Sequence, residues 1–190
     1  MPEATKASTN RPRTAVPQAS SDEKPYEERT LQIDRVARVV KGGRRFRFRA
    51  LVVVGDKKGK VGIGSAKGAD VTLAINKASD VAKKHMVEIS LYNETIPHEV
   101  EAKVSGAKLL LMPARPGTGL IAGGAIRSIL EVAGVKNALS KSLGSSNKTN
   151  TAYATIKALT ELVPREKWVT YVPKKTAAKK PTTKAKKAVK

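Results

Sequence analysis

Cysteine is absent from this 190-residue sequence, and histidine occurs only twice. Without thiols the chain can form no disulfide, no thiolate metal site and no cysteine nucleophile. His85 and His98 do not have the H-x-x-x-H spacing of two zinc ligands on one helix face. We therefore expect neither a metal ion nor a cofactor.

Long apolar runs are missing as well. No run approaches the roughly 20 residues that span a bilayer, and the first residues hold no apolar signal-peptide core. Arg11 and Arg13, among several Ser and Thr, keep an organellar transit peptide open, whereas Glu3, Asp22 and Glu23 count against it. We expect no membrane contact and a cytoplasmic location.

Acidic residues are scarce beside basic ones, with 16 Asp and Glu against 37 Lys and Arg, and the net charge is +21. Four basic and three acidic residues fall in residues 1–25, and eight Lys without an acid fall in residues 173–190, which leaves +12 between them. A folded segment with that excess is typical of proteins that bind a phosphate backbone.

The two ends of the chain differ in composition from its middle. Residues 1–25 are rich in Pro, Ser, Thr and Ala, and residues 173–190 consist mostly of Lys, Ala, Thr and Pro. Such segments bury too little apolar surface to offset their ordering entropy. We expect a disordered arm, a folded region and a Lys-rich disordered tail. Aromatics make up only 4% of the chain, so Val, Ile, Leu and Ala must build the core.

The first part of the folded region predicts three strands and then a helix. The strands are expected at residues 31–40, 45–54 and 60–65, and the helix at residues 70–86, with Asp70 as N-cap. Gly42 and Gly43 suit a tight hairpin turn. Gly62 and Gly64 weaken the third strand and indicate close approach of another backbone. The pattern predicts a small sheet with a helix across one face.

The second part alternates strands and helices. Strands are expected at residues 86–92, 99–104 and 108–112, a helix after the Gly-rich loop at residues 113–124, and a last helix from Asn147 to a stop at Pro164. Gly134 is the natural C-cap of the first of these helices. Residues 135–143 hold at best a strand and a loop.

The hairpin carries the strongest functional signal. Residues 35–49 contain six Arg, one Lys and no acid, and Arg45, Arg47 and Arg49 alternate so that they share one face. A solvated edge strand also favours cations. Two or three Lys would suffice for that purpose. Arg differs from Lys because one guanidinium group can bind two phosphate oxygens at once. We therefore expect this hairpin to contact RNA.

Signals for catalysis are weak. Gly62, Gly64 and Gly68 do not keep the G-x-G-x-x-G spacing, and the Gly-rich loop lacks a phosphate-loop ending. That loop with Arg115 fits either a structural turn or an anion-binding helix start. His98 beside Glu99 is better read as a turn residue than as a general base. We expect no enzyme and no small-molecule substrate.

Six segments together resemble one protein family. The sequence is similar, from about Arg29 to Leu162, to bacterial-type ribosomal protein five of the small subunit. The segments are KGGRRFRFRALVVVGD (Lys41 to Asp56), KVGIG (Lys60 to Gly64), TIPHEV (Thr95 to Val100), PGTGLIAGGAIR (Pro116 to Arg127), LEVAGV (Leu130 to Val135) and SLGSSN (Ser142 to Asn147).

The resemblance implies an α+β fold of two domains. Residues 26–93 would form a domain like those that bind double-stranded RNA, with a three-stranded sheet and a helix. Residues 94–172 would form a two-layer α/β domain with a left-handed βαβ crossover, against the usual right-handed rule.

The resemblance also implies a role in translation. The hairpin would bind small-subunit ribosomal RNA near the site of spectinomycin action, and the chain would line the mRNA entry channel and affect accuracy. Ribosomal proteins four and eight of the small subunit would be its partners, with Gly117, Thr118, Gly119 and Arg127 at the contact with protein four. We expect the RNA-binding residues to be Arg35, Arg38, Lys41, Gly42, Gly43, Arg44, Arg45, Arg47, Arg49, Lys57, Lys58, Lys60 and Lys67.

Two other functions are compatible with parts of the sequence. A free regulator that binds double-stranded RNA needs only the N-terminal domain. An enzyme is the other alternative, because the C-terminal fold type is shared with some kinases and ATPases, and fold alone does not decide function.

Overall fold

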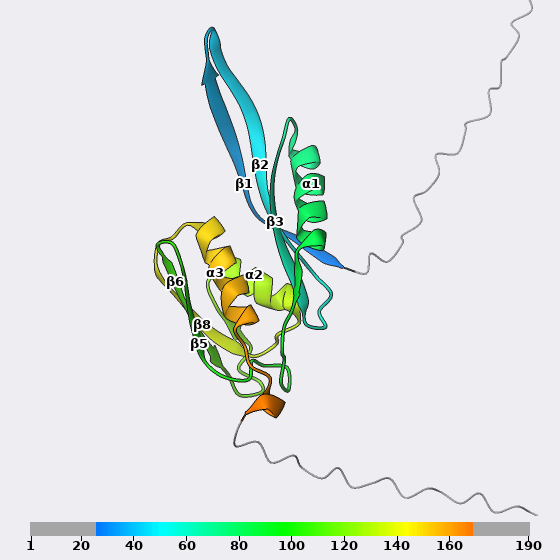
Figure 1. The fold of residues 1–190 in the computed structure, drawn as a ribbon, viewed down its shortest axis with the longest axis vertical. Helices are drawn as coiled ribbons and strands as arrows, with labels where there is room; N and C mark the ends of the chain where they lie inside the picture. Colours follow the sequence, from blue (N-terminus) through cyan, green and yellow to red (C-terminus); the bar gives the residue numbers. More distant parts are fainter. Residues whose placement is uncertain (1–25, 169–190) are drawn as a thin grey trace, which may run out of the picture.

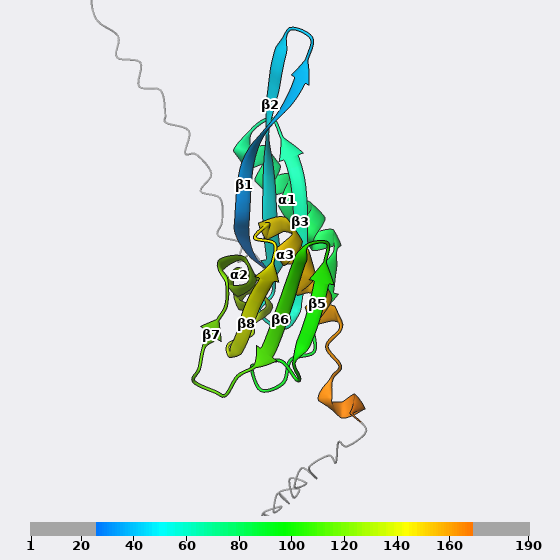
Figure 2. The ribbon, with the colours of Figure 1, turned by 90° about the vertical axis from the view of Figure 1, so that its left-hand side faces the viewer.

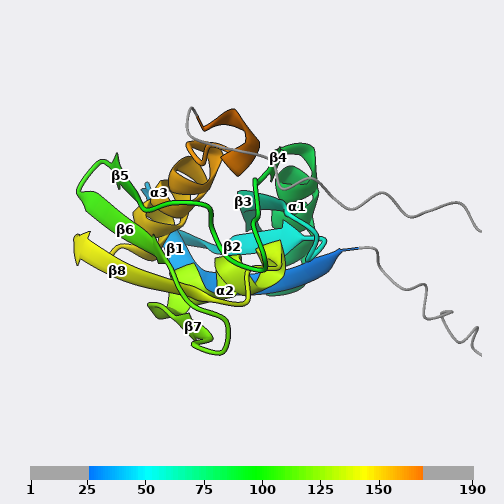
Figure 3. The same cartoon turned by 90° about the horizontal axis from the view of Figure 1, so that it is seen from below.

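The computed structural model describes residues 26–168 (Figure 1). The expected arm at residues 1–25 and the expected tail at residues 173–190 lie outside the described residues. We call residues 26–93 the N-terminal half and residues 94–168 the C-terminal half. Seen from below, the layers follow one another as the C-terminal sheet, α2 and α3, the N-terminal sheet, and α1 (Figure 3).

The N-terminal half is an antiparallel sheet with one helix. Its strands are β1 (Glu27–Val40), β2 (Gly43–Gly55), β3 (Lys60–Gly68) and β4 (Met86–Glu88), in that spatial order, and the helix is α1 (Val71–Lys84). The three expected strands and the helix are present. The strand expected at residues 86–92 is reduced to β4, which pairs with the start of β3 and adds a fourth strand.

Glycines let α1 lie against β3. A Cβ placed on Gly64 would be 2.0 Å from the carbonyl oxygen of Ala78, and one on Gly62 would be 2.2 Å from that of Ala82. The expected close approach of another backbone is thus confirmed. Asp70 occupies the N-cap position of α1, but its side chain makes no capping hydrogen bond.

Strand β2 is buried on both faces from Ala50 to Gly55. Ala50, Val52 and Val54 belong to the core under α1. Leu51 and Val53 point to the other face and belong to a core that also includes residues of α2 and α3. The two halves therefore share the hydrophobic core on this second face of the N-terminal sheet.

The C-terminal half has a mixed sheet with helices on one face. Its strands are β5 (Val100–Val104), β6 (Ala107–Pro113), β7 (Leu120–Ile121) and β8 (Ala138–Gly144), in the order β5-β6-β8-β7. The helices are α2 (Gly124–Ala133) and α3 (Lys148–Thr160), followed by a short 3-10 helix, η1 (Arg165–Lys167). Strands β7 and β8 are parallel and joined through α2, which makes a βαβ unit. The opposite face of this sheet carries no helix of the described residues (Figure 2).

The helix ends follow local sequence signals. Gly134 is the C-cap of α2 with φ 91°, as expected. Asn147 caps α3 by accepting a hydrogen bond from the Thr149 N–H at 3.1 Å. Helix α3 ends at Thr160, before the expected stop at Pro164. Within residues 26–168, no helix has the length and apolar character needed to cross a membrane.

Candidate nucleic-acid interface

The β1–β2 hairpin projects beyond the rest of the sheet (Figures 1 and 2). Strand β3 pairs with β2 only from Phe48 to Gly55, so the hairpin outside this stretch has two strands. Its turn uses Gly42 with φ 96° and Gly43 with φ 151°. Residues with a side chain disfavour both conformations. Because the projecting part has no third strand, both of its faces are accessible.

One face of the hairpin is a basic groove. Arg38 pairs across the strands with Arg45, and Val36 pairs with Arg47, so all four side chains point to the same face. The face is the one that carries Leu51 and Val53 further down the sheet. The groove has a volume of about 680 Å³, and its lining residues include no acid. We define the basic groove by its cations Arg38, Lys41, Arg45, Arg47 and Lys67.

Arg49 shares that face but is already engaged. Its Nη2 and Nε donate to Asp34 Oδ2 at 2.6 and 3.2 Å. The hydrogen bond from Arg49, with a second one from Gln32, lowers the pKa of Asp34. The charge of Lys148, the first residue of α3, acts in the same direction. Arg49 thus forms an ion pair within the protein, at the base of the groove.

The other face of the hairpin differs in character. Arg44 pairs with Val39 and Arg35 pairs with Phe48, so these arginines point away from the basic groove. The Arg35 guanidinium lies 4.1 Å from the centroid of the Phe46 ring. The cations that the sequence grouped together are thus divided between two faces.

The lysines of the next turn are remote from the hairpin tip. Lys57, Lys58 and Lys60 lie beyond the far end of β2, a strand of 13 residues that starts at Gly43. An extended strand of that length spans roughly 40 Å. Lys57 Nζ is 2.5 Å from Glu27 Oε2. The expected RNA-binding residues therefore do not form one continuous surface, because the length of β2 separates the cations of the hairpin from these lysines.

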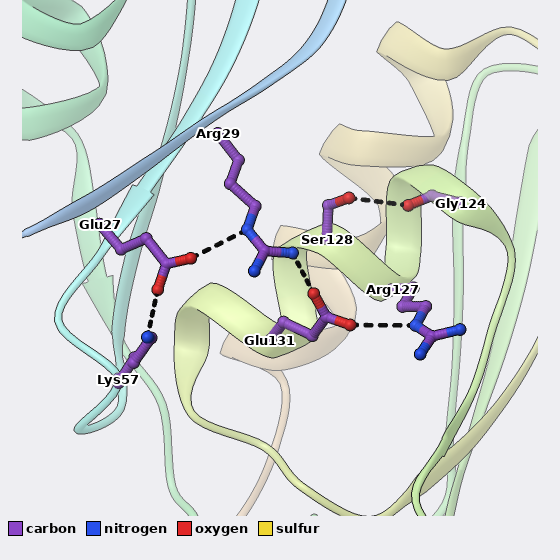
Figure 4. A network of polar contacts seen from close by, with 7 residues as sticks. All are labelled: Glu27, Arg29, Lys57, Gly124, Arg127, Ser128 and Glu131. Atoms are coloured by element: carbon purple, nitrogen blue, oxygen red, sulfur yellow. Dashed lines mark hydrogen bonds and ion pairs between the residues drawn. The ribbon is translucent and has the colours of Figure 1, made fainter.

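A chain of five alternating charges joins the two halves (Figure 4). We call it the interdomain ion-pair chain, and it consists of Lys57, Glu27, Arg29, Glu131 and Arg127. Arg29 on β1 donates to Glu27 at 2.9 Å and to Glu131 on α2, and Arg127 Nε donates to Glu131 Oε1 at 3.0 Å.

Hydrogen bonds within the interdomain ion-pair chain stabilise the charged form of its two carboxylates. The bond from Lys57, followed by that from Arg29, lowers the pKa of Glu27. The bond from Arg127, followed by that from Arg29, lowers the pKa of Glu131. Arg127 faces outward, as expected, but its charge already has a partner on the same helix.

The loop before α2 is held by a residue that the sequence analysis missed. Asn137 is buried, and its Oδ1 accepts hydrogen bonds from the N–H groups of Gly117 at 3.1 Å and Gly119 at 3.0 Å. Thr118, between them, is exposed. The only sign of this role in the sequence was a single Asn side chain in the short link between α2 and β8. The loop is thus a fixed turn with Thr118 exposed on it.

The residues considered for catalysis have structural roles. His98 Nε2 accepts a hydrogen bond from the Val163 N–H at 3.0 Å, and its Nδ1 lies 2.8 Å from the Glu99 carbonyl oxygen. Both ring nitrogens are therefore bound to the main chain. Residues 26–168 contain no group of three His, Asp or Glu that could hold a metal ion.

This fold and the basic groove define a basic α+β protein with a positively charged surface suited to polyanions. Residues 26–90 match the family model described as ribosomal protein S5, N-terminal domain, and residues 102–169 match ribosomal protein S5, C-terminal domain. The small ribosomal subunit protein uS5 of Thermus thermophilus is 54% identical over 137 residues, which cover 72% of this chain and 85% of that protein. The protein of the same name from Chloroflexus aurantiacus is 52% identical over 136 residues, which cover 72% and 76%.

The chain belongs to the ribosomal protein S5 family. It is a structural ribosomal protein and not an enzyme, so the catalytic alternative is set aside. Proteins of this family are found in the small ribosomal subunit, in the cytoplasm. The resemblance seen in the six sequence segments is confirmed.

Proposed function

We propose that this protein binds small-subunit ribosomal RNA chiefly through the basic groove. The observation that supports this most is the register of β1 and β2, which brings Arg38, Arg45 and Arg47 onto one face. No acid lines the groove beside them. Alternate residues of a strand are about 7 Å apart, so neighbouring guanidinium groups can bind separate phosphates.

Lys58 and Lys60 would contact a second stretch of RNA. They are exposed at the opposite end of the N-terminal sheet, too far from Lys41 to share its phosphates. The protein would then join two RNA segments, which suits a structural constituent that supports assembly of the subunit.

Two surfaces of the C-terminal half fit protein partners. The fixed turn at Gly117 and Gly119 exposes Thr118, and Arg127 on α2 offers an outward guanidinium. The family resemblance favours ribosomal protein four at these residues. The helix-free face of the C-terminal sheet exposes Ile121 and Leu143, which fits a second protein such as ribosomal protein eight. The family resemblance would also put the chain at the mRNA entry channel, where these contacts would influence translational accuracy.

The RNA proposal is tested with the full chain. Its affinity for small-subunit ribosomal RNA and for an unrelated RNA duplex is measured between low and high salt. We expect tighter binding to ribosomal RNA and a salt slope equivalent to about 6–10 phosphate contacts, at about 0.7–0.9 per contact. Equal affinity for the two RNAs would favour a general double-stranded-RNA binder, and a flat salt dependence would contradict phosphate contact.

A further inference from the structure

The face of the hairpin opposite the basic groove exposes an aromatic ring. The chain has two phenylalanines. Phe48 packs against the core under α1, together with Ile75 and Met86. Phe46 points to the same face two residues further toward the tip, where β3 has already ended. It is 49% exposed, so its ring is not needed to fill the core.

The ring is held in place by a cation. The Arg35 guanidinium lies 4.1 Å from the ring centroid, within the range of a cation–π contact. The cross-strand neighbour of Phe46 is Ala37, a residue with only a small side chain to cover the ring. Val39, further along the same face, is 76% exposed. A planar aromatic and a planar cation are thus presented together, beside apolar surface, on a projecting hairpin.

We propose that Phe46 and Arg35 form a stacking platform for an unpaired nucleobase, and this inference rests on the proposed RNA binding. Nucleobases that are not paired in a helix stack on aromatic rings and guanidinium planes. Bases inside a perfect duplex have no free face to offer. The hairpin therefore binds RNA on both faces, with phosphates in the basic groove and one base of a loop or bulge on the platform.

This arrangement predicts a division of labour between the two faces. The basic groove supplies salt-dependent affinity for any RNA backbone. The platform supplies a salt-independent preference for RNA that has an unstacked base at the right place. Removing the ring changes the preference and leaves the salt slope as it is, whereas removing groove cations changes the slope.

The test uses the full chain with two RNA probes that carry the same number of phosphates. One is a stem–loop with 2-aminopurine in its loop, and the other is a fully paired duplex. We expect Phe46→Ala to weaken stem–loop binding about tenfold, the equivalent of about 1.4 kcal/mol, with duplex binding unchanged. Phe46→Leu, which keeps apolar bulk without a ring, should behave like Phe46→Ala. Phe46→Tyr should bind like wild type. The 2-aminopurine fluorescence should be quenched by wild type and not by Phe46→Leu.

Three results would overturn the platform. These are an equal loss of both probes in Phe46→Ala, stem–loop binding by Phe46→Leu as tight as that of wild type, and fluorescence that stays constant on binding. A failure of the underlying RNA proposal looks different, because the wild-type chain itself would then show no salt-dependent binding to either probe. Thermal melting of each variant checks the fold, and no shift is expected because the ring lies outside the core.

Discussion

Arg29 on β1 and Glu131 on α2 form an ion pair between the two halves of the protein, although they are 102 residues apart in the sequence. Glu131 also accepts from Arg127, and Arg29 also donates to Glu27. The pair lies above the core that the halves share. The interdomain ion-pair chain therefore adds a directional contact to the apolar contact between the halves.

Replacing Glu131 by Gln should destabilise the protein by about 1–2 kcal/mol, between the values typical of exposed and of buried ion pairs. Its carboxylate serves two arginines and is only 28% exposed. Urea unfolding of the purified chain measures the difference.

Glu101→Gln is the matched control, because Glu101 pairs with Lys108 at an exposed site. Loss of such a surface pair should cost less than about 0.5 kcal/mol. Equal effects of the two variants would contradict a special role for the interdomain ion-pair chain.

Stability should fall in acid because of the same carboxylates. The pKa values of Glu27, Glu131 and Asp34 are lowered in the folded state. Their contribution is therefore complete above the ordinary carboxyl pKa, which is 4.5 for Glu, and is lost as the pH falls through the lower folded values. Urea unfolding at successive pH values should show the unfolding free energy decreasing below that point. Glu131→Gln should show a smaller decrease, and a decrease as large as that of wild type would refute this assignment.

The packing of α1 against β3 makes a sharp prediction about glycine. A Cβ added at Gly64 would lie 2.0 Å from a main-chain oxygen of α1. Gly64→Ala should therefore cost more than about 2 kcal/mol, as overpacking against a fixed backbone does. Thermal melting of the purified variant measures the loss.

Gly124→Ala is the control for this substitution. Nothing lies within 4 Å of its Cβ position, and the residue begins helix α2, where Ala is favoured over Gly. The melting temperature should not fall in this variant. A small fall in the melting temperature of Gly64→Ala would contradict the prediction and mean that α1 shifts easily away from β3.

Arg127→Leu should raise misreading if this residue contacts ribosomal protein four. The substitution removes an exposed guanidinium that lines the same pocket as Leu120, the residue after the fixed turn at Gly117 and Gly119. Truncation of such an anchor commonly costs about 2 kcal/mol or more of binding. Stop-codon readthrough in cells should increase, with a normal yield of small subunits. Arg127→Lys keeps a cation near Glu131 and should give a weaker effect.

Two other outcomes for Arg127→Leu have clear meanings. Unchanged readthrough with normal yield would remove the proposed protein contact. A loss of small subunits without misreading would instead make Arg127 a contact needed for assembly.

Local patterns in the sequence predicted the elements that depend on local rules. The alternation around Arg45 and Arg47, the glycines of β3 and the cap at Gly134 each follow from period, sterics or φ alone. Each is confirmed by the structure. Most of the order of strands and helices follows from the same signals. Strand β7 lies within residues 113–124, which the sequence predicted as a loop, and β8 lies where it predicted at best a strand and a loop.

Contacts between distant segments were not predictable in this way. The pairing of Arg49 with Asp34 depends on the register of β1 on β2, and the same register places Arg38 opposite Arg45. Asn137 holds a loop 18 to 20 residues away from it. Such partners are set by tertiary packing, which no local periodicity encodes.

The basic groove itself is tested most directly by the salt dependence of RNA binding. Arg38, Arg45 and Arg47 are replaced together by Gln, and the affinity of the full chain for small-subunit ribosomal RNA is measured at several salt concentrations. Removing three phosphate contacts should reduce the slope by about 2–3 units. The melting temperature should barely change, because all three side chains are exposed.

The matched control replaces Lys77, Lys84 and Lys103 by Gln, which removes the same charge from exposed residues to which the account gives no RNA contact. That variant should keep nearly the whole slope. The account predicts a clearly flatter slope for the groove variant than for this control, with both proteins folded. An unchanged slope in the groove variant, or the same change in both, would contradict it.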